Sequence, residues 1–327
     1  AVTISNSTIV NNIVTNGYSN HWGGGIAIAN QTTVSLVNSI VCGNTPNQID
    51  DEFGQTHDVA YSSIEGGYTG TGNIHSDPLF VNRTASNYHI LANSLCVNSG
   101  HPDSTDSDGT IADMGALPYI NGYSGPDWYV STTGSDEVGT GESNNPFASI
   151  QSGMNFIQNS ESLLVQPGTY SVNINYGGKE ITLKSIQGAE STIFTPANPN
   201  LPMVQFGANE TASAILDGFS FHNAETAGGA ISFGGNSNAT VKNSIITNTI
   251  SQHPITFNQA AGTLLNCIIT DNEGYSPLYF YYVNGSKVVN CTFANNSAPD
   301  AGVAQISAGE APSFINCIMW NEGIQEL

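Results

Sequence analysis

The stretch Leu264-Leu265-Asn266-Cys267-Ile268-Ile269-Thr270-Asp271-Asn272 recurs along the chain and decides its fold. Its first six positions return in the C-terminal half, at 241–246, 288–293 and 314–319. The repeated Asn falls at 243, 266, 290 and 316, so successive copies are 23, 24 and 26 residues apart. A nearly constant step of this size is typical of a solenoid in which one repeat forms one coil. The apolar and β-branched residues on either side of the Asn indicate short strands that stack coil upon coil.

The position after the repeated Asn carries a small side chain in four successive coils, Ser244, Cys267, Cys291 and Cys317. Equivalent positions in stacked strands lie about 4.8 Å apart, which is within the Cα range of a disulfide. In-register side chains point the same way, however, so we expect a buried ladder of thiols here. The sequence leaves the state of Cys42 and Cys96 open.

The charge balance excludes some partners and favours others. One Arg and four Lys oppose 26 acidic residues, which gives a formal net charge of −21. A nucleic-acid partner is excluded because it needs a basic face. No apolar run approaches the roughly 20 residues of a membrane span, so no membrane insertion is predicted. The acidic excess favours cations, Ca²⁺ above all, although solubility in a salty extracellular medium explains the same charge.

Residues 75–119 differ in character from the coils before them. They contain Asp77-Pro78-Leu79-Phe80, then Tyr88-His89-Ile90, then Ser94-Leu95-Cys96 with Gly100, and finally Asp113-Met114-Gly115-Ala116. This order resembles the C-terminal ending of right-handed parallel β-helix repeat proteins of bacterial and archaeal cell surfaces, the type called choice-of-anchor Q. It departs at Leu95, where that family usually has Pro. The resemblance implies that the segment closes a solenoid, whose last coil has strand edges and a bare core to cover.

A second β-helix start follows a Gly-, Ser- and Pro-containing linker at 120–126. Trp128-Tyr129-Val130-Ser131, then Asn145-Pro146-Phe147 with Ile150-Gln151, and then Val165-Gln166-Pro167-Gly168 resemble the beginning of a right-handed β-helix domain over 127–195. Phe147, Ile150, Met154 and Ile157 fall at helical spacing and predict a short helix near 146–158. The resemblance implies that this helix caps the N-terminal end of the core.

The predicted fold is therefore all-β, a right-handed parallel β-helix in two parts. Residues 1–119 are the coils and end cap of one β-helix, and residues 127–327 are the cap and coils of a second. An end cap and a starting cap should not lie in the middle of one stack. Because residue 1 falls inside a repeat and Leu327 follows one, we expect the chain to be a piece of a longer or processed protein.

The best candidate for a metal site is an acidic loop with Asp103, Asp106 and Asp108, followed by Asp113. Carboxylates close together near Gly109 offer the hard oxygen ligands that Ca²⁺ prefers. The pattern is looser than an EF-hand loop and lacks its terminal Glu, and a solvated acidic loop is the alternative. Ca²⁺ is the one cofactor that the sequence predicts.

A binding surface is predicted from the alternation in 278–283. Leu278, Phe280 and Tyr282 would share one face of a strand, and Tyr279, Tyr281 and Val283 the other. Two exposed tyrosines on a rigid sheet, Tyr279 and Tyr281, would form a strip for sugar stacking or protein contact unless a loop covers them. Trp22 adds one aromatic side chain at a corner.

No catalytic residues are predicted. Lyase chemistry next to a uronate carboxylate needs a basic side chain and a group that neutralises the carboxylate, and basic residues are scarce here. We therefore expect a protein that is not an enzyme, with a structural or adhesive role outside the cell or at its surface. It would associate with itself, as in a fibre, or with other surface proteins. The alternative is a carbohydrate-binding or lyase-like, polysaccharide-degrading β-helix module.

Overall fold

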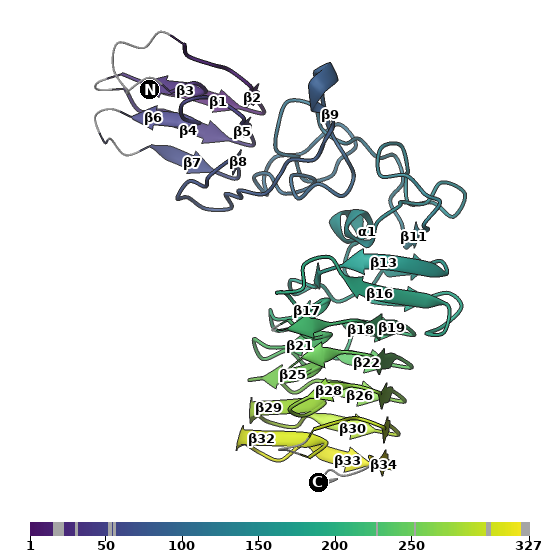
Figure 1. The fold of residues 1–327 in the computed structure, drawn as a ribbon. Helices are drawn as coiled ribbons and strands as arrows, with labels where there is room; N and C mark the ends of the chain where they lie inside the picture. Colours follow the sequence, from purple (N-terminus) through teal and green to yellow (C-terminus); the bar gives the residue numbers. More distant parts are fainter. Residues whose placement is uncertain are drawn as a thin grey trace. The chain divides into compact units, whose positions relative to one another are not determined.

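The computed structural model describes residues 1–15, 23–29, 32–51, 54, 57–226, 228–251, 253–298 and 302–321. The chain divides into two compact units: unit 1 is residues 1–124 with 136–140, and unit 2 is residues 125–135 with 141–327. The coils of both units pair their strands in parallel, so the predicted all-β parallel solenoid is confirmed (Figure 1). No described helix is long and apolar enough to cross a membrane.

Unit 1 has three short parallel sheets that stack coil on coil. The first contains β1 (Val2–Ser5), β4 (Val34–Val37) and β7 (Asp58–Ala60). The second contains β2 (Thr8–Val10), β5 (Ile40–Cys42) and β8 (Ser63–Ile64). The third pairs β3 (Ile26–Ile28) with β6 (Ile49–Asp51). After the coils, β9 (Phe80–Asn82), the 3₁₀ turn η1 (Arg83–Ala85) and β10 (Asn87–Ile90) form an antiparallel hairpin.

Residues 75–119 pack on the coils of unit 1. The backbone N–H of Gly115 donates to the Asn38 carbonyl at 2.8 Å, and the N–H of His101 donates to the Asn38 side chain at 2.7 Å. Arg83, the only Arg of the chain, donates to the Cys42 sulfur at 2.7 Å. Cys96 and Met114 are buried. The segment thus contributes side chains to the core of unit 1, while the choice-of-anchor type stays a prediction.

Unit 2 is built from three long parallel sheets and one short one, labelled in part in Figure 1. The eight-stranded sheet contains β11 (Asp127–Val130), β12 (Ser162–Val165), β15 (Thr182–Ser185), β18 (Ile215–Asp217), β22 (Thr240–Lys242), β26 (Thr263–Leu265), β30 (Lys287–Val289) and β33 (Ser313–Ile315). The seven-stranded sheet contains β13 (Gly168–Val172), β16 (Thr192–Pro196), β19 (Ser220–His222), β23 (Ile245–Thr247), β27 (Ile268–Thr270), β31 (Thr292–Ala294) and β34 (Ile318–Trp320). The six-stranded sheet contains β14 (Ile174–Asn175), β17 (Val204–Phe206), β21 (Ile231–Phe233), β25 (Ile255–Asn258), β29 (Leu278–Val283) and β32 (Ala304–Gly309). The short sheet contains β20 (Glu225–Thr226), β24 (Ile250–Ser251) and β28 (Glu273–Gly274).

A column of phenylalanines fills the core behind the six-stranded sheet. Phe206, Phe233, Phe257 and Phe280 occupy consecutive coils and are fully buried. The rings of Phe233 and Phe257 stack with centroids 4.5 Å apart, and those of Phe257 and Phe280 with centroids 4.7 Å apart. Burial of one such side chain stabilises the fold by about 2–3 kcal/mol. The six-stranded sheet is therefore a firm support for whatever its outer face carries.

A second column, made of amides, satisfies the buried backbone at another corner. Asn296 is buried and accepts hydrogen bonds from the backbone and the side chain of Asn272, at 3.2 and 2.9 Å. It donates to the Ile269 carbonyl at 2.9 Å and to Asn321 at 3.0 Å. In unit 1, Asn12 and Asn44 repeat this contact. Each coil thus supplies the hydrogen-bond partner for the coil before it.

A short helix covers the first coil of unit 2. The helix α1 spans Ile150–Phe156, with Ser149 as its N-cap, so it is shorter than the predicted 146–158. Pro146 and Phe147 lie before it, because the chain becomes helical only after the Ser149 cap. The Phe156 ring stacks on Phe147 and Trp128, with centroids 5.3 and 5.7 Å apart. The half-buried Lys179 donates from its ammonium to the Met154 and Ile157 carbonyls at 2.8 and 2.9 Å, which satisfies the helix C-terminus.

Candidate functional site

The candidate site lies on the outer face of the six-stranded sheet, around β29. Its tyrosines reach solvent, with Tyr275, Tyr281 and Tyr282 exposed to 52%, 37% and 57%. Tyr279 is half-buried. The inner face of the same strand packs Leu278 and Phe280 into the core. The fold therefore directs Tyr279 and Tyr281 outward, as the alternation predicted, from a strand that is held on its other side.

A β-bulge redirects Tyr282. Phe280 pairs with Ile306, Tyr281 with Ala308 and Val283 with Gly309, so the pairing skips Tyr282 on one strand and Ser307 on the other. Tyr282 has φ +49°, and Val283 instead of Tyr282 is buried. The prediction that Tyr282 shares the inner face with Leu278 and Phe280 is thus wrong. A bulge shifts the alternation by one residue and turns a side chain toward a new direction.

The exposed rings form a continuous aromatic row. The His253 ring lies 6.1 Å from Tyr275 and stacks on Tyr279 at 4.5 Å, with ring planes 12° apart. Tyr279 lies 6.4 Å from Tyr281, and Tyr281 meets Tyr282 edge-on at 4.6 Å. Burial lowers the pKa of His253, although its hydrogen bond with the Ser276 carbonyl opposes that shift. The imidazole is therefore neutral at pH 7 and extends the apolar surface of the row.

A groove adjoins this row at the corner that follows the six-stranded sheet. It has a volume of about 370 Å³, and the described residues that line it are all uncharged: Asn236, Gln259, Ala260, Ala261, Tyr282 and Asn284. The two alanines are small and mostly buried, and the others are exposed. An aromatic ring beside several amides gives one wall for apolar contact and several donors and acceptors for hydroxyl groups.

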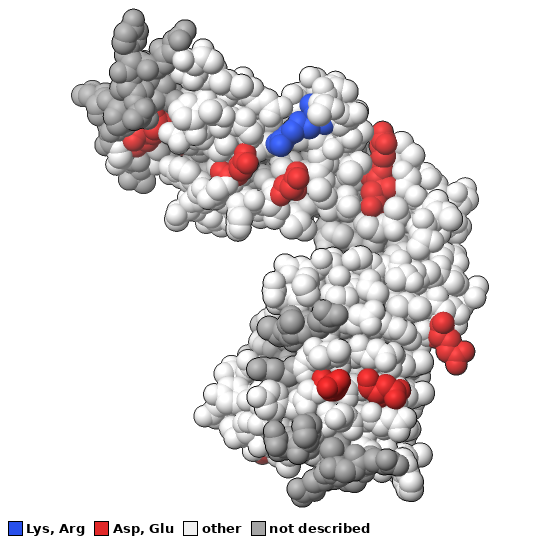
Figure 2. Space-filling view, in the orientation of Figure 1, with Lys and Arg blue, Asp and Glu red and all other residues white. Residues whose placement is uncertain are grey.

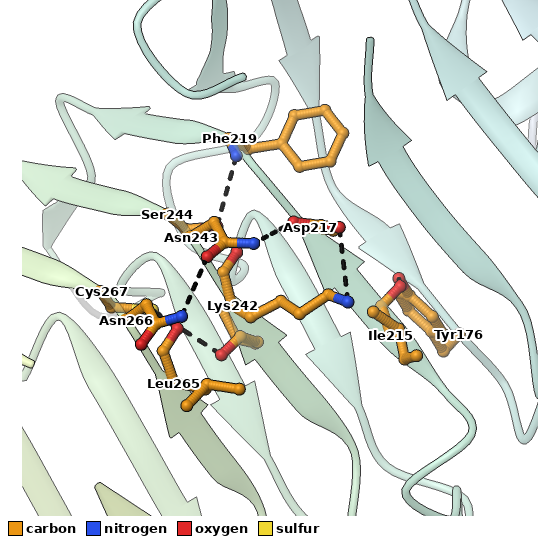
Figure 3. Close-up of polar contacts among 11 residues, drawn as sticks. Tyr176, Ile215, Asp217, Phe219, Lys242, Asn243, Ser244, Leu265, Asn266 and Cys267 are labelled. Carbon is orange, nitrogen blue, oxygen red and sulfur yellow. Dashed lines mark hydrogen bonds and ion pairs between the residues drawn. The ribbon is translucent and has the colours of Figure 1, made fainter. Parts of the chain in front are cut away.

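The ladder of Ser244, Cys267, Cys291 and Cys317 lies at a different corner and has a structural role. Ser244 and Cys267, both labelled in Figure 3, each donate to the carbonyl two residues earlier, at 2.9 and 3.5 Å. Cys291 and Cys317 repeat this bond. The first three side chains are buried, and all five cysteines are free. Contact with Cys291 and burial hold the pKa of Cys267 well above its usual range, so this thiol is neutral.

The exposed Asn residues beside this ladder also bond to one another. Figure 3 shows Asn243 donating to Asp217 at 2.7 Å and Asn266 donating to Asn243 at 3.3 Å. Asn290 continues the row by donating to Asn266 at 3.1 Å. Lys242 pairs with Asp217 at 3.5 Å. These contacts account for the repeated Asn without a ligand.

The predicted calcium loop uses its carboxylates to hold the backbone. Asp106 accepts the N–H of Asp113 at 2.7 Å, and Asp108 accepts the N–H of Asn121 at 2.8 Å. Asp113 accepts the N–H groups of Asn98 and Tyr119 at 2.7 and 2.6 Å. Asp103 is exposed. Within the described ranges, no group of three or more His, Cys, Asp or Glu side chains is arranged to hold a metal ion. The calcium site stays a prediction.

Sequence reasoning identified part of the site and missed part. Tyr279 and Tyr281 lie in the aromatic row, whereas Trp22 lies outside the described residues. Tyr282, Gln259 and Asn236 were missed. The sequence contains a signal for these residues in their distance from the repeated Asn. Asn236 and Gln259 each lie 7 residues before the repeated Asn of their coil, whereas Tyr282 lies 8 residues before Asn290. The extra residue in that coil coincides with the bulge.

Comparison with known proteins supports the fold. The family model described as "Right handed beta helix region" matches residues 205–325, in agreement with the predicted right-handed β-helix. No curated protein matches the sequence. Among solved structures, a rhamnogalacturonan lyase matches with TM-score 0.36 and 14% identity, over 60% of this chain and 62% of that one. A PL6 family alginate lyase matches with TM-score 0.41 and 14% identity, over 98% of this chain and 47% of that one. The pectin methylesterase from Aspergillus niger matches with TM-score 0.30 and 10% identity, over 62% of this chain and 88% of that one.

These matches correct one prediction. The sequence predicted a chain that is not an enzyme, and this is contradicted by the named structures, which are enzymes. The physical reason for the error is that a shortage of basic side chains bears only on chemistry with anionic substrates and says nothing of catalysis in general. At these identities the likenesses show the fold alone and assign no activity to this chain. The chain spans less than two thirds of the length of both lyases.

Proposed function

We propose that this chain is a carbohydrate-binding β-helix module, which holds a polysaccharide on the aromatic row and groove of the six-stranded sheet. The observation that carries the proposal is the set of exposed tyrosines on a strand whose other face is locked into the core. Tyrosine combines a flat apolar ring with a hydroxyl group, and sugars present apolar C–H faces edged by hydroxyls. Exposed apolar patches of this kind mark interaction sites.

The rigid support favours binding. The Phe257 and Phe280 rings stack directly behind the strand that carries Tyr279 and Tyr281. Side chains that are already ordered lose little conformational entropy when a ligand arrives, so more of the contact energy is available for affinity. The stacking of Tyr279 on His253 restricts both rings further.

The location of the binding and the other predicted partners stay predictions. We propose that it takes place outside the cell or at the cell surface, where a structural or adhesive chain would meet polysaccharides. The predicted self-association into a fibre and contact with other surface proteins are separate proposals, and so is the predicted calcium ion, since the groove includes none of the carboxylates of the acidic loop.

The test is affinity electrophoresis of the full chain through gels that contain neutral or uronate polysaccharides. We expect at least one polymer to retard the parent protein. The double variant Tyr279→Ala/Tyr281→Ala should lose most of that retardation, because it removes the centre of the row. Trp320→Ala is the matched control: Trp320 is 72% exposed but lies on the seven-stranded sheet. Equal retardation of the double variant and the parent, or no retardation by any polymer, would sink the proposal.

A further inference from the structure

We infer that the groove beside Tyr282 selects neutral sugar residues and rejects uronates. This inference rests on the proposed function and adds the chemical class of the ligand. It also assigns the selection to particular side chains, those that line the groove at the corner after the six-stranded sheet.

The first step is a row of left-handed residues at this corner. Asn209, Asn236, Gln259 and Tyr282 have φ of +62°, +60°, +54° and +49° in successive coils. The N–H of Asn236 donates to the Gln259 carbonyl at 2.8 Å, and the N–H of Gln259 donates to the Tyr281 carbonyl at 2.9 Å. The side chains of the row are therefore about one strand spacing, roughly 4.8 Å, apart. A sugar chain that runs from coil to coil would meet one of them at each step.

The second step is the chemistry of these side chains. Asn236, Gln259 and Asn284 each present a carbonyl oxygen and an amide NH₂ to the groove. A sugar hydroxyl is both a donor and an acceptor, so an amide can satisfy it in either direction. A carboxylate is an acceptor only and carries a charge that has to be compensated when water is removed. None of the described residues that line the groove has a positive charge.

The third step concerns the few basic residues. Arg83 donates to Cys42 in unit 1, and the half-buried Lys179 donates to two backbone carbonyls. Lys242 is paired with Asp217. Lys184 and Lys287 are exposed on the eight-stranded sheet, outside the groove lining. No cation of the described chain is therefore among the groove residues.

The fourth step is the acidic surroundings. The backbone N–H of Glu310 donates to the Val283 carbonyl at 2.9 Å, so an acidic residue follows the groove in the next coil. Figure 2 shows acidic side chains spread over the visible face of the molecule, with little basic surface. A formal charge of −21 repels polyanions before they reach the groove. The uncharged lining of the groove and the negative electrostatic potential of the protein thus both disfavour the binding of uronates.

The experiment is isothermal titration of the full chain with neutral polymers (a β-glucan, a xylan and a mannan) and with polygalacturonate and alginate, at low and high salt. We expect at least one neutral polymer to bind about tenfold more tightly than either uronate, with little salt dependence. Gln259→Lys should then raise uronate affinity about tenfold at low salt, and high salt should abolish this gain. Gln and Lys both have unbranched side chains, so the substitution should leave the strain of the left-handed backbone at this position unchanged.

Gln158→Lys is the control, because it makes the same change of charge at an exposed position outside the sheets. Circular dichroism checks that each variant is folded, and Asn236→Lys replaces Gln259→Lys if the latter is not. Tighter binding of a uronate than of every neutral polymer would overturn this inference and leave the proposed function standing. An equal gain in uronate affinity from Gln158→Lys would overturn the assignment to the groove. Binding of none of the polymers would overturn the proposed function itself, and with it this inference.

Discussion

Several rows of left-handed residues run along the coils of unit 2, one of them at Asn223, Asn248, Asp271 and Asn295 after the seven-stranded sheet, and two others differ in regularity. The row after the eight-stranded sheet holds Asn at 243, 266, 290 and 316. The row after the six-stranded sheet holds Asn209, Asn236, Gln259 and Tyr282. Asn tolerates this conformation better than any residue except Gly, so folding alone explains the first row. A bulky aromatic residue there is an outlier. The comparison teaches that repetition in this solenoid follows from its fold, and the departure at Tyr282 is the feature on which the proposed binding rests.

The largest expected effect is in unit 1, at Asp113, which lies in the segment whose His101 and Gly115 N–H groups donate to Asn38. Burial raises the pKa of Asp113 from 3.8 to about 7, even though N–H groups of Asn98 and Tyr119 lower it. The native state therefore keeps a proton that the unfolded state loses above pH 4. This contribution to stability is complete below about pH 4 and is lost as the pH rises through 7, a change of about 4 kcal/mol.

Hydrogen–deuterium exchange of residues 94–119, corrected for intrinsic rates, measures this contribution between pH 4.5 and 8. Protection should fall with pH in the parent. It should change much less in Asp113→Asn, which does not titrate. The same pH dependence in both proteins would show that Asp113 is not the group responsible.

The next largest effect separates the buried amide column from the exposed Asn row. Asn296→Ala removes two donated hydrogen bonds and leaves the backbone and side chain of Asn272 without their acceptor. Buried groups without partners cost about 1–3 kcal/mol each, so we expect a loss of about 3 kcal/mol. Asn290→Gly, at an exposed position with φ +54°, should cost less than about 1 kcal/mol. Urea denaturation compares the two, and similar losses would remove the distinction between a buried column and an exposed row.

A smaller effect of opposite sign is expected at the irregular row. Tyr282→Asn introduces an asparagine, the residue that occupies the same corner two coils earlier, at Asn236. Because Asn accepts a left-handed backbone more readily than Tyr, the variant should be more stable by about 0.5–1 kcal/mol. Improved stability with impaired binding is the usual sign of a residue kept for function. Thermal unfolding decides this, and a clear loss of stability would mean that Tyr282 serves the fold.

The smallest effect is expected in the thiol ladder. Cys291→Ser introduces the residue found at the same place in the coil of Ser244, which donates to the Lys242 carbonyl at 2.9 Å. The hydroxyl would donate to the Val289 carbonyl in place of the thiol. We expect a cost below about 1 kcal/mol in urea denaturation. A loss above about 3 kcal/mol would mean that the sulfur has a role that this ladder does not explain.

The sequence was sufficient for the regular part of this molecule. The repeated Asn marks a left-handed corner that short-range sterics impose in every coil, so its spacing gave the coils directly. The strand at 278–283 shows the limit. Its alternation predicted Tyr279 and Tyr281 correctly, but Tyr282 has a left-handed backbone and is skipped in the pairing with Ala308 and Gly309, so Val283 is buried in its place. Bulges depend on how two coils of unequal length are paired, which one repeat alone does not reveal.

The groove was beyond sequence reasoning for a related reason. Asn236, Gln259 and Tyr282 are 23 residues apart and have three different side chains of two chemical types. Only stacking brings them into one row. The acidic loop is a separate case: the sequence predicts Asp106 and Asp113 as calcium ligands, and in the structure their oxygens accept backbone N–H groups, so the calcium site stays a prediction.

The central claim is that Tyr282 and its neighbours bind a neutral polysaccharide. The most direct measurement is an isothermal titration with the neutral polymer that the parent binds best, repeated with Tyr282→Asn. We predict affinity about tenfold weaker for the variant, together with equal or higher stability. Unchanged affinity in a folded Tyr282→Asn protein would contradict the account.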